Sequence, residues 1–252
     1  MHGRAPLTRH LRGSGIELGP GHQPFDLPPD VSVRYADRWR PEQNRVLYPE
    51  LGEDVAFPDV DVVIDFDVDR LSAFPDASED FVICSHVLEH LAEPLGFIGE
   101  MHRVLRPGAI AVVLLPDRTR TFDRHRAPTS VEHLAAEHDA GVTVVDDEHM
   151  VDFLTQSGPE AAFIQMPEGG DRAEFFDWHR RRSIHVHCWA DGEFDAVLDY
   201  CRTLGQRWDI VDRLPLADDG IEFGYVLRKA TPRRRRWRDR RTTRRSGQDI
   251  LR

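Results

Sequence analysis

Short apolar runs alternate with patterns of helical spacing in the first half of the chain. Five of these runs are expected to form strands, at residues 15–18, 31–37, 60–65, 81–85 and 110–115. The last three runs are nearly continuous, which is typical of strands covered on both faces. A helix is expected to begin in "HVLEHL", directly after the fourth strand, and another to follow Pro94 and end at "RPGA". Strands that alternate with helices predict a parallel, doubly wound α/β sheet.

The pattern changes after residue 117. Two short helices are expected in "TSVEHLAAEHDAG" and "VDDEHMVDFLTQSG". Thr129 and Glu132 have the spacing of a capping box at the start of the first helix, and Gly141 would end it. We interpret the region from about residue 117 to 183 as an inserted helical lid.

Three further segments follow the expected lid. "IHVHCW", residues 184–189, alternates as a strand would, which places His185 and His187 on one face with Trp189 behind them. "DGEFDAVLDYCRTLG" has the apolar stripe of an amphipathic helix. "WDIVDRL" and "IEFGYVLRK" are expected to be strands, and the turn "LADDG" between them predicts antiparallel pairing. Residues 1–229 are therefore expected to form one domain.

The composition is that of an ordinary globular protein. The 252 residues are 40% hydrophobic and 31% charged, which is enough chain for one α/β domain with a core. No apolar run approaches the roughly 18 residues of a membrane span, and the N-terminus shows no signal-peptide pattern. The three cysteines are scattered and form no CxxC pair, so they predict neither a zinc site nor a disulfide framework. A cytoplasmic protein with no membrane span is expected.

The charge is unevenly distributed along the chain. The formal net charge is −11, and ten arginines and two aspartates give residues 230–252 a charge of +8, which leaves −19 on residues 1–229. Such a basic block can bind nucleic acid or an anionic surface. We favour a solvated, disordered tail over residues 230–252, so nucleic acid is not an expected partner.

A glycine turn follows the first expected strand. "GPG", residues 19–21, would let a ligand approach the backbone at the carboxyl end of that strand, and the next strand ends in Asp37. An acid at this position can accept hydrogen bonds from both hydroxyls of a ribose. The turn departs from the G-x-G-x-x-G pattern and shows no cradle for a pyrophosphate, which favours a cofactor with adenosine but without phosphates over a dinucleotide.

Four segments, in this order, resemble class I S-adenosylmethionine (SAM)-dependent methyltransferases over residues 13–117. They are "IELGPG", "YAD", "LSAFPDASEDFVICSHVLEH" and "HRVLRPGAIAVVLLPD". The resemblance implies a Rossmann-like sheet of seven strands, mostly parallel with an antiparallel last strand. Two features depart from the family pattern. Only about a dozen residues precede the first strand, and "PGA" stands where the family has "PGG".

The resemblance also implies a set of cofactor-binding residues. Glu17, Gly19 and Gly21 would flank the methionine part of SAM, and Asp37 would bind its ribose. The adenine amino group would meet Asp67, with Asp65 as the competing acid, and the backbone N–H of Val68 would also contact the ring. Ser85 and His86, at the end of the fourth strand, would lie near the sulfonium. Glu89 and His90, one turn into the expected helix, are interpreted as structural or surface residues.

The acceptor is predicted partly from patterns that the chain lacks. It has neither the Asn/Asp-Pro-Pro-aromatic pattern of adenine and cytosine amino-methylases nor a Pro-Cys pair for cytosine C5 methylation. O-methylation requires an aligned hydroxyl and a base for its proton. "PDRTRTFDRHRAPTSVEHL" and "IHVHCW" resemble a branch of methyltransferases of sugar and polysaccharide biosynthesis, including actinobacterial enzymes that O-methylate mannose-containing polysaccharides. A sugar or oligosaccharide hydroxyl is therefore the expected acceptor.

Histidines of the second half are the expected catalytic groups. His133 and His187 match motif histidines of that branch and are the expected bases, with His86 as the candidate if neither acts. An imidazole titrates near 6.5 and can accept a proton at neutral pH. A hard cation, Mg²⁺ or Mn²⁺, could polarise a sugar diol. The candidate ligands for such a cation are polar residues of the second half of the chain. These ligands are Asp117, Asp123, His133 and His187.

Other classes of function stay open from the sequence. The chain could methylate another small molecule, or an RNA or protein reached through the arginine-rich tail, in which case deleting residues 230–252 should abolish activity. It could also be a regulator that binds SAM without catalysis. A homodimer is compatible with the sequence, which favours no oligomeric state.

Overall fold

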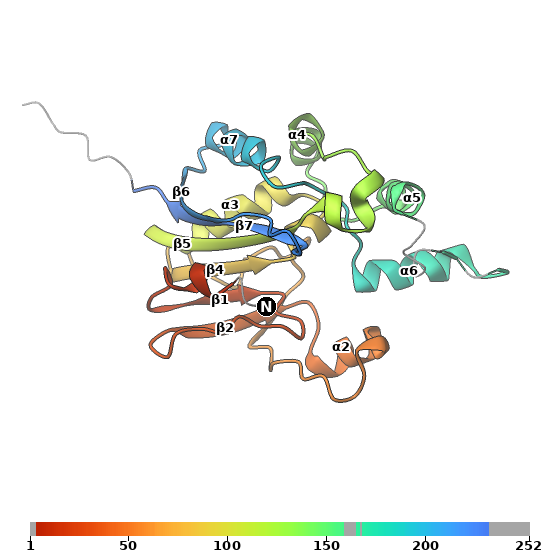
Figure 1. The fold of residues 1–252 in the computed structure, drawn as a ribbon, viewed down its shortest axis with the longest axis horizontal. Helices are drawn as coiled ribbons and strands as arrows, with labels where there is room; N and C mark the ends of the chain where they lie inside the picture. Colours follow the sequence, from red (N-terminus) through yellow and green to blue (C-terminus); the bar gives the residue numbers. More distant parts are fainter. Residues whose placement is uncertain (1–3, 159–164, 167, 232–252) are drawn as a thin grey trace, which may run out of the picture.

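The computed structural model describes residues 4–158, 165–166 and 168–231 (Figure 1). Its centre is a seven-stranded sheet with the strand order β3-β2-β1-β4-β5-β7-β6. The strands are β1 Ser14–Leu18, β2 Ser32–Asp37, β3 Val62–Val63, β4 Glu79–Ser85, β5 Leu105–Pro116, β6 Trp208–Leu214 and β7 Glu222–Lys229. Strands β1 to β5 pair in parallel, and β7 is antiparallel to both β5 and β6. The predicted fold class, a mostly parallel α/β sheet with an antiparallel last strand, is confirmed.

Helices and short 3-10 turns connect the strands. The α-helices are α1 Ala5–Thr8, α2 Pro41–Leu47, α3 Pro94–Val104, α4 Val131–Ala140, α5 Asp147–Gln156, α6 Arg172–Arg182 and α7 Asp195–Thr203. The 3-10 turns are η1 Pro49–Leu51, η2 Leu88–His90, η3 Arg118–Arg120 and η4 Phe122–His125. Within the described ranges, no helix is long and apolar enough to cross a membrane.

The central strands are buried on both faces, which explains their continuous apolar runs. Successive side chains of a strand point to opposite faces of the sheet. Val82 and Val113 belong to the core that packs against α3, α4 and α7, which lie together on one side of the sheet (Figure 1). Ile83 belongs to the core on the other face, with Leu7 and Leu11 of the N-terminal segment.

Two predicted elements of the sheet domain are shorter than expected. The strand expected at 60–65 is reduced to β3, which pairs only with β2. "HVLEHL" forms only the short turn η2. His86 has a left-handed backbone with φ 54°, and Glu93, which precedes a proline, has the non-helical angles φ −144° and ψ 83°. A continuous helix therefore begins only at Pro94.

The region between β5 and β7 differs more from the prediction. Ser130, not Thr129, caps α4, because its hydroxyl accepts the His133 N–H. Helix α6 was not predicted, since "RAEFFDWHRRR" is too polar to show a clear apolar stripe. The strand expected at 184–189 is wrong: only Trp189 makes a β-bridge, to Asp117, among the described residues. The basic tail lies, from residue 232 onward, outside the described residues.

Side chains and loops, instead of a neighbouring strand, bond the backbone of 184–189. Arg126 donates to the carbonyls of His185 and Val186 at 2.7 and 2.8 Å. The backbone N–H of His187 donates to the carbonyl of Glu89 at 3.0 Å. These bonds hold the segment beside η2, so two parts of the chain nearly a hundred residues apart meet at one point.

Candidate functional site

A cavity of about 330 Å³ lies at the carboxyl ends of the parallel strands. This is the edge at which open α/β sheets bind their ligands, and the volume suits a small molecule. Six of the residues predicted to bind the cofactor line it: Gly19, Gly21, Asp37, Asp65, Asp67 and His86. Glu17, Val68 and Ser85 do not belong to its lining.

The glycine turn after β1 leaves room at the floor of the cavity. Gly19 and Gly21 both have left-handed backbones, with φ of 57° and 53°. A Cβ atom on Gly19 would approach Cγ2 of Val87 to 3.0 Å, whereas one on Gly21 would meet no atom within 4 Å. The turn therefore needs glycine at residue 19 for both conformation and space, and at residue 21 for conformation.

Asp37 ends β2 with a buried carboxylate that faces the cavity. Its Oδ1 accepts the backbone N–H of Trp39 at 3.1 Å. Burial raises the pKa of Asp37, and backbone N–H groups, including that of Gly21, oppose the shift. Asp37, the acid that the resemblance assigns to the ribose, therefore lines the cavity beside the glycine turn.

Glu17 supports the turn from behind instead of lining the cavity. Its carboxylate oxygens accept the Phe25 N–H at 3.1 and 3.3 Å. Burial raises the pKa of Glu17 to about 7, despite this hydrogen bond. Glu17 therefore holds the loop that follows the glycine turn.

The loop after β3 distinguishes the two candidate acids for adenine. Oδ1 of Asp65 accepts the N–H groups of Asp67 and Val68, and its Oδ2 pairs with Arg38 at 2.9 Å. Asp67 accepts the Ala92 N–H with Oδ1 at 2.8 Å. The Val68 N–H is thus directed at Asp65, and the Val68 side chain is 65% exposed outside the cavity.

The C-terminal end of α6 closes one side of the cavity. Trp39 donates its indole N–H to the carbonyl of Arg181 at 3.1 Å, and Tyr48 donates its hydroxyl to the carbonyl of Arg182 at 2.8 Å. Trp39, Tyr48, Arg181 and Arg182 all line the cavity. Helix α6 is therefore joined at the site to the segment that follows β2.

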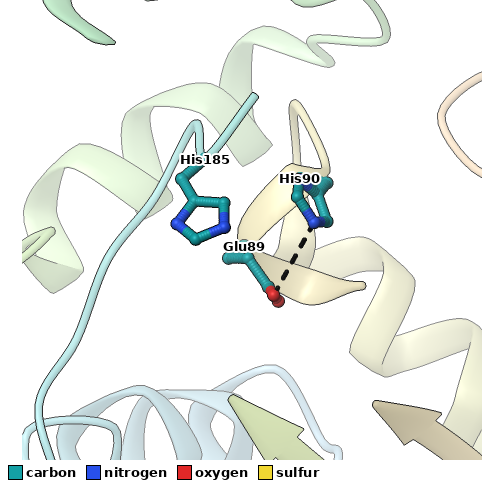
Figure 2. Close-up of side chains that lie close together, drawn as sticks. All are labelled: Glu89, His90 and His185. Atoms are coloured by element: carbon teal, nitrogen blue, oxygen red, sulfur yellow. Dashed lines mark ion pairs between the residues drawn. The ribbon is translucent and has the colours of Figure 1, made fainter. Parts of the chain in front are cut away.

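A group of histidines surrounds a buried carboxylate beside this cavity. Glu89 is fully buried, and neither of its carboxylate oxygens has a hydrogen-bond partner among the described residues. Nδ1 of His86 lies 3.5 Å and Nε2 of His90 lies 3.7 Å from Oε1 of Glu89. Figure 2 shows the ring of His185 pointing from its own segment of chain toward the side chain of Glu89. Glu89, which the sequence suggested to be a structural or surface residue, is thus buried.

Each of these three histidines has a second partner at its other ring nitrogen. Nδ1 of His90 donates to the carbonyl of Ile184 at 2.8 Å. Nδ1 of His185 lies 2.5 Å from Oδ2 of Asp123, and Nε2 of His86 lies 2.8 Å from Oε2 of Glu222. Burial alone would lower the pKa of His86, but the hydrogen bond to Glu222 and the charge of Glu89 raise it above its usual value.

His133 and His187 lie in a second group, around Glu137. His133 and His149 contact Oε1 of Glu137 at 3.0 and 2.8 Å, and Nε2 of His187 lies 3.5 Å from Oε2. His187 is fully buried, and burial lowers its pKa to about 3. Neither His133 nor His187 lines the cavity, and His185 and His187 point into different groups because their segment is not a strand.

The predicted metal ligands do not converge. Asp117 accepts the N–H groups of Thr119 and Asp191, and Asp123 pairs with Arg126 and His185. Neither acid joins His133 and His187 in any three-residue group of potential ligands within the described ranges. The set Asp117, Asp123, His133 and His187 is therefore wrong as a Mg²⁺ site.

The group around Glu137 predicts a pH-dependent stability. Burial alone would raise the pKa of Glu137, but hydrogen bonds from His133 and His149 lower it to about 2. The hydrogen bond to Glu137 raises the pKa of both histidines above 6.5. The carboxylate stabilises the fold above its unfolded pKa of 4.5 and loses this effect as the pH falls toward 2. The histidines stabilise it below 6.5 and lose this effect as the pH rises through their folded pKa values.

We therefore expect Glu137→Gln to lower the free energy of unfolding most between pH 4.5 and 6.5, the two reference values of these groups. Urea denaturation of the wild type and the variant from pH 3 to pH 9 would measure the difference. A difference that is equal at all these pH values would contradict the assignment. Glu132→Gln, on the same helix but outside the group, serves as the control.

Comparisons with known proteins agree with this geometry. Residues 40–113 match the family described as "Methyltransferase domain". Over 44 residues the chain is 48% identical to a probable S-adenosylmethionine-dependent methyltransferase of Mycolicibacterium smegmatis. That stretch is 18% of this chain and only 17% of the relative's length.

Solved structures share the fold at low sequence identity. One of them is a Rhodobacter sphaeroides protein named as a candidate Zn-dependent alcohol dehydrogenase. It is 12% identical to this chain, the match covers 91% of this chain and 89% of that protein, and the TM-score is 0.53. A SAM-dependent methyltransferase of Methanosarcina mazei is 16% identical over 90% and 98% of the two chains, with a TM-score of 0.47. Residues 40–113 of this chain are therefore similar to a methyltransferase domain, and they lie within a sheet of strand order β3-β2-β1-β4-β5-β7-β6.

Proposed function

We propose that this chain binds SAM in the cavity and transfers its methyl group to a hydroxyl of a sugar or oligosaccharide. The observation that carries the proposal is the buried carboxylate of Asp37, which faces the cavity beside the open glycine turn. A carboxylate is an acceptor-only group and suits the two hydroxyls of a ribose.

The adenine is proposed to lie against the loop after β3. Asp67 uses Oδ1 for the Ala92 N–H, which leaves Oδ2 as the acceptor for the adenine amino group. Asp65 is committed to backbone N–H groups and to Arg38. The structure therefore favours Asp67 over Asp65 for this role and offers no Val68 N–H to the ring.

Methyl transfer needs one proton acceptor from the chain. The acceptor oxygen forms a bond to the methyl carbon while the carbon–sulfur bond breaks, and its electron pair stays on sulfur. The sulfonium becomes the neutral thioether of S-adenosylhomocysteine, and the hydroxyl loses its proton. We assign this proton to His86, the histidine that lines the cavity at the end of β4 with Glu222 at its other nitrogen.

The surroundings of the cavity support a polar acceptor such as a sugar. Trp39 and Tyr48 line it beside the polar end of α6, and small-molecule sites combine aromatic walls with a few placed polar groups in this way. His86 stands where nucleobase amino-methylases carry their Asn/Asp-Pro-Pro motif. This favours hydroxyl over nucleobase methylation.

Replacing Asp37 by Ala should weaken SAM binding by about 1.5–3 kcal/mol, the value of charge-assisted hydrogen bonds to the ribose. Isothermal titration calorimetry measures the change directly. Asp30→Ala, an exposed acid between β1 and β2, should leave the affinity unchanged. Equal SAM affinity in both variants would remove Asp37 from the site, and a wild-type preference for NAD over SAM would overturn the proposed cofactor.

The acceptor is tested by product release. The protein is incubated with SAM and a panel of mono- and oligosaccharides, amines and RNA, and S-adenosylhomocysteine is quantified. Release with sugars supports the proposal, and release only with amines or RNA contradicts it. SAM binding without release in any sample would favour a regulator that binds SAM without catalysis.

A further inference from the structure

Glu89 is a buried carboxylate that the protein leaves unsatisfied. Both of its oxygens lack a hydrogen-bond partner among the described residues, and the side chain has no exposed surface. Burying an ionised group without partners is costly, so such a group in a native fold calls for a bound species. The groups that approach Glu89 are ring nitrogens of histidines, a residue type that commonly binds metal ions.

Two histidines face this carboxylate from different segments. His90 follows Glu89 in η2, and His185 comes from the segment held beside it (Figure 2). One ligand atom of each of the three residues lies within 4.8 Å of the others. Ligands about 2.0–2.2 Å from one ion lie roughly 3–3.5 Å apart, so small rotamer movements would bring these atoms to bonding distance.

We propose that Glu89, His90 and His185 bind a divalent transition metal ion, with zinc as the ion of choice. Two imidazoles and one carboxylate form the ligand set of catalytic zinc sites and leave at least one coordination position open. Mg²⁺ and Ca²⁺ prefer oxygen ligands, which this group supplies only through Glu89. The site therefore differs from the oxygen-rich Mg²⁺ site expected from the sequence in its ligands and in its metal.

The outer partners of the histidines match this role. A metal-bound histidine usually donates its other ring N–H to a carboxylate or a backbone carbonyl, which fixes the nitrogen that faces the metal. His90 meets the carbonyl of Ile184 in this way, and His185 meets Asp123. Asp123 is in turn held by Arg126 at 2.8 Å. Both ligands are thus oriented with Nε2 left for the ion.

The group around Glu137 is a weaker candidate. Oε1 of Glu137 is already hydrogen-bonded to both His133 and His149, and only its Oε2 lacks a partner among the described residues, whereas both oxygens of Glu89 lack one. His133 is also half exposed. This group provides a matched control of the same ligand types in the same protein.

The role of the metal ion in the reaction rests on the proposed function: the ion would act on the acceptor hydroxyl. His90 and His86 both line the cavity, so the ion would lie at its wall, beside the residue assigned as the base. A hydroxyl in the open coordination position would be polarised and would lose its proton to His86 more easily. The acceptor class would then be a hydroxyl compound that can reach the ion.

The test is zinc binding by the full chain. After dialysis against a chelator, the wild type should bind one equivalent of Zn²⁺ more tightly than Glu89→Gln and His185→Asn by at least about 100-fold, measured by competition with a zinc-sensitive dye. Glu137→Gln should bind as the wild type does. Co²⁺ substitution should give visible absorption bands in the wild type that are lost in the two site variants. Far-UV circular dichroism of each variant verifies that it is folded.

The outcomes separate this inference from the proposed function. SAM affinity is measured by calorimetry in the same samples. Zinc binding that is absent, or unchanged by both site variants, overturns the metal site even if SAM binds normally. Zinc binding lost in Glu137→Gln but kept in Glu89→Gln would place the ion in the other group and also overturn the proposal. A protein that binds zinc at Glu89 but not SAM would support the site and contradict the proposed function.

Discussion

Replacing His86 by Asn is expected to lower the rate of methyl transfer by about 10²–10⁴-fold, the usual contribution of a positioned base. SAM binding should remain, because the groups proposed to hold the ribose and the adenine are Asp37 and Asp67. Asn is the suitable replacement because His86 has a left-handed backbone, which Asn adopts more readily than most residues. Single-turnover assays with SAM and an accepted sugar would measure the change.

The geometry favours His86 over the two histidines that the sequence suggested as bases. His86 lines the cavity, and Glu222 is positioned to orient the His86 ring. Arg4 holds Glu222 in turn, through two hydrogen bonds to its carboxylate at 3.0 and 2.7 Å. His187 is fully buried away from the cavity, and His133 faces Glu137. His133→Ala is therefore the control and should keep near-normal turnover. Normal turnover in His86→Asn together with a large loss in His133→Ala would reverse this assignment.

The sheet and its cofactor edge could be predicted from the sequence because their signals are local. Strands β4 and β5 are marked by apolar runs that burial on both faces imposes, and the turn at Gly19 needs glycine for its left-handed backbone and for space. Asp37 was predicted from its place at the end of the second strand. These features depend on a few consecutive residues and on the order of the elements.

The histidine group could not be predicted because it is a product of tertiary packing. "HVLEH" and "IHVHCW" both stand in the sequence, but nothing local indicates that they meet. The alternation in "IHVHCW" suggested a strand, whereas Arg126 and the Glu89 carbonyl take the backbone bonds that a neighbouring strand would have made. A histidine next to a glutamate in "EH" was the available signal. It was interpreted as a structural or surface pair on a helix, because the segment that packs against Glu89 is so distant in the chain.

Arg126 is the residue that joins these distant parts, so its loss should be severe. It is 5% exposed, and it contacts the carboxylates of Asp123 and Asp152 and the carbonyls of His185 and Val186. Arg126→Met removes the charge and keeps much of the side-chain length. Asp123 would remain buried without its guanidinium, and breaking a buried ion pair from one side costs about 3–5 kcal/mol. We expect the free energy of unfolding to fall by that amount.

Urea denaturation would measure this loss, with Arg202→Met as the control. Arg202 pairs with Asp199 on the surface of α7, where both side chains are more than half exposed, and such pairs contribute about 0–1 kcal/mol. Adding Asp123→Asn to Arg126→Met should recover part of the lost stability, because the buried carboxylate that has lost its guanidinium partner is then replaced by a neutral amide. Equal destabilisation by Arg126→Met and Arg202→Met would show that Arg126 does not hold the 184–189 segment in place. The hydrogen bond from Arg126 to the carbonyl of His185 would then not explain why His185 lies beside Glu89.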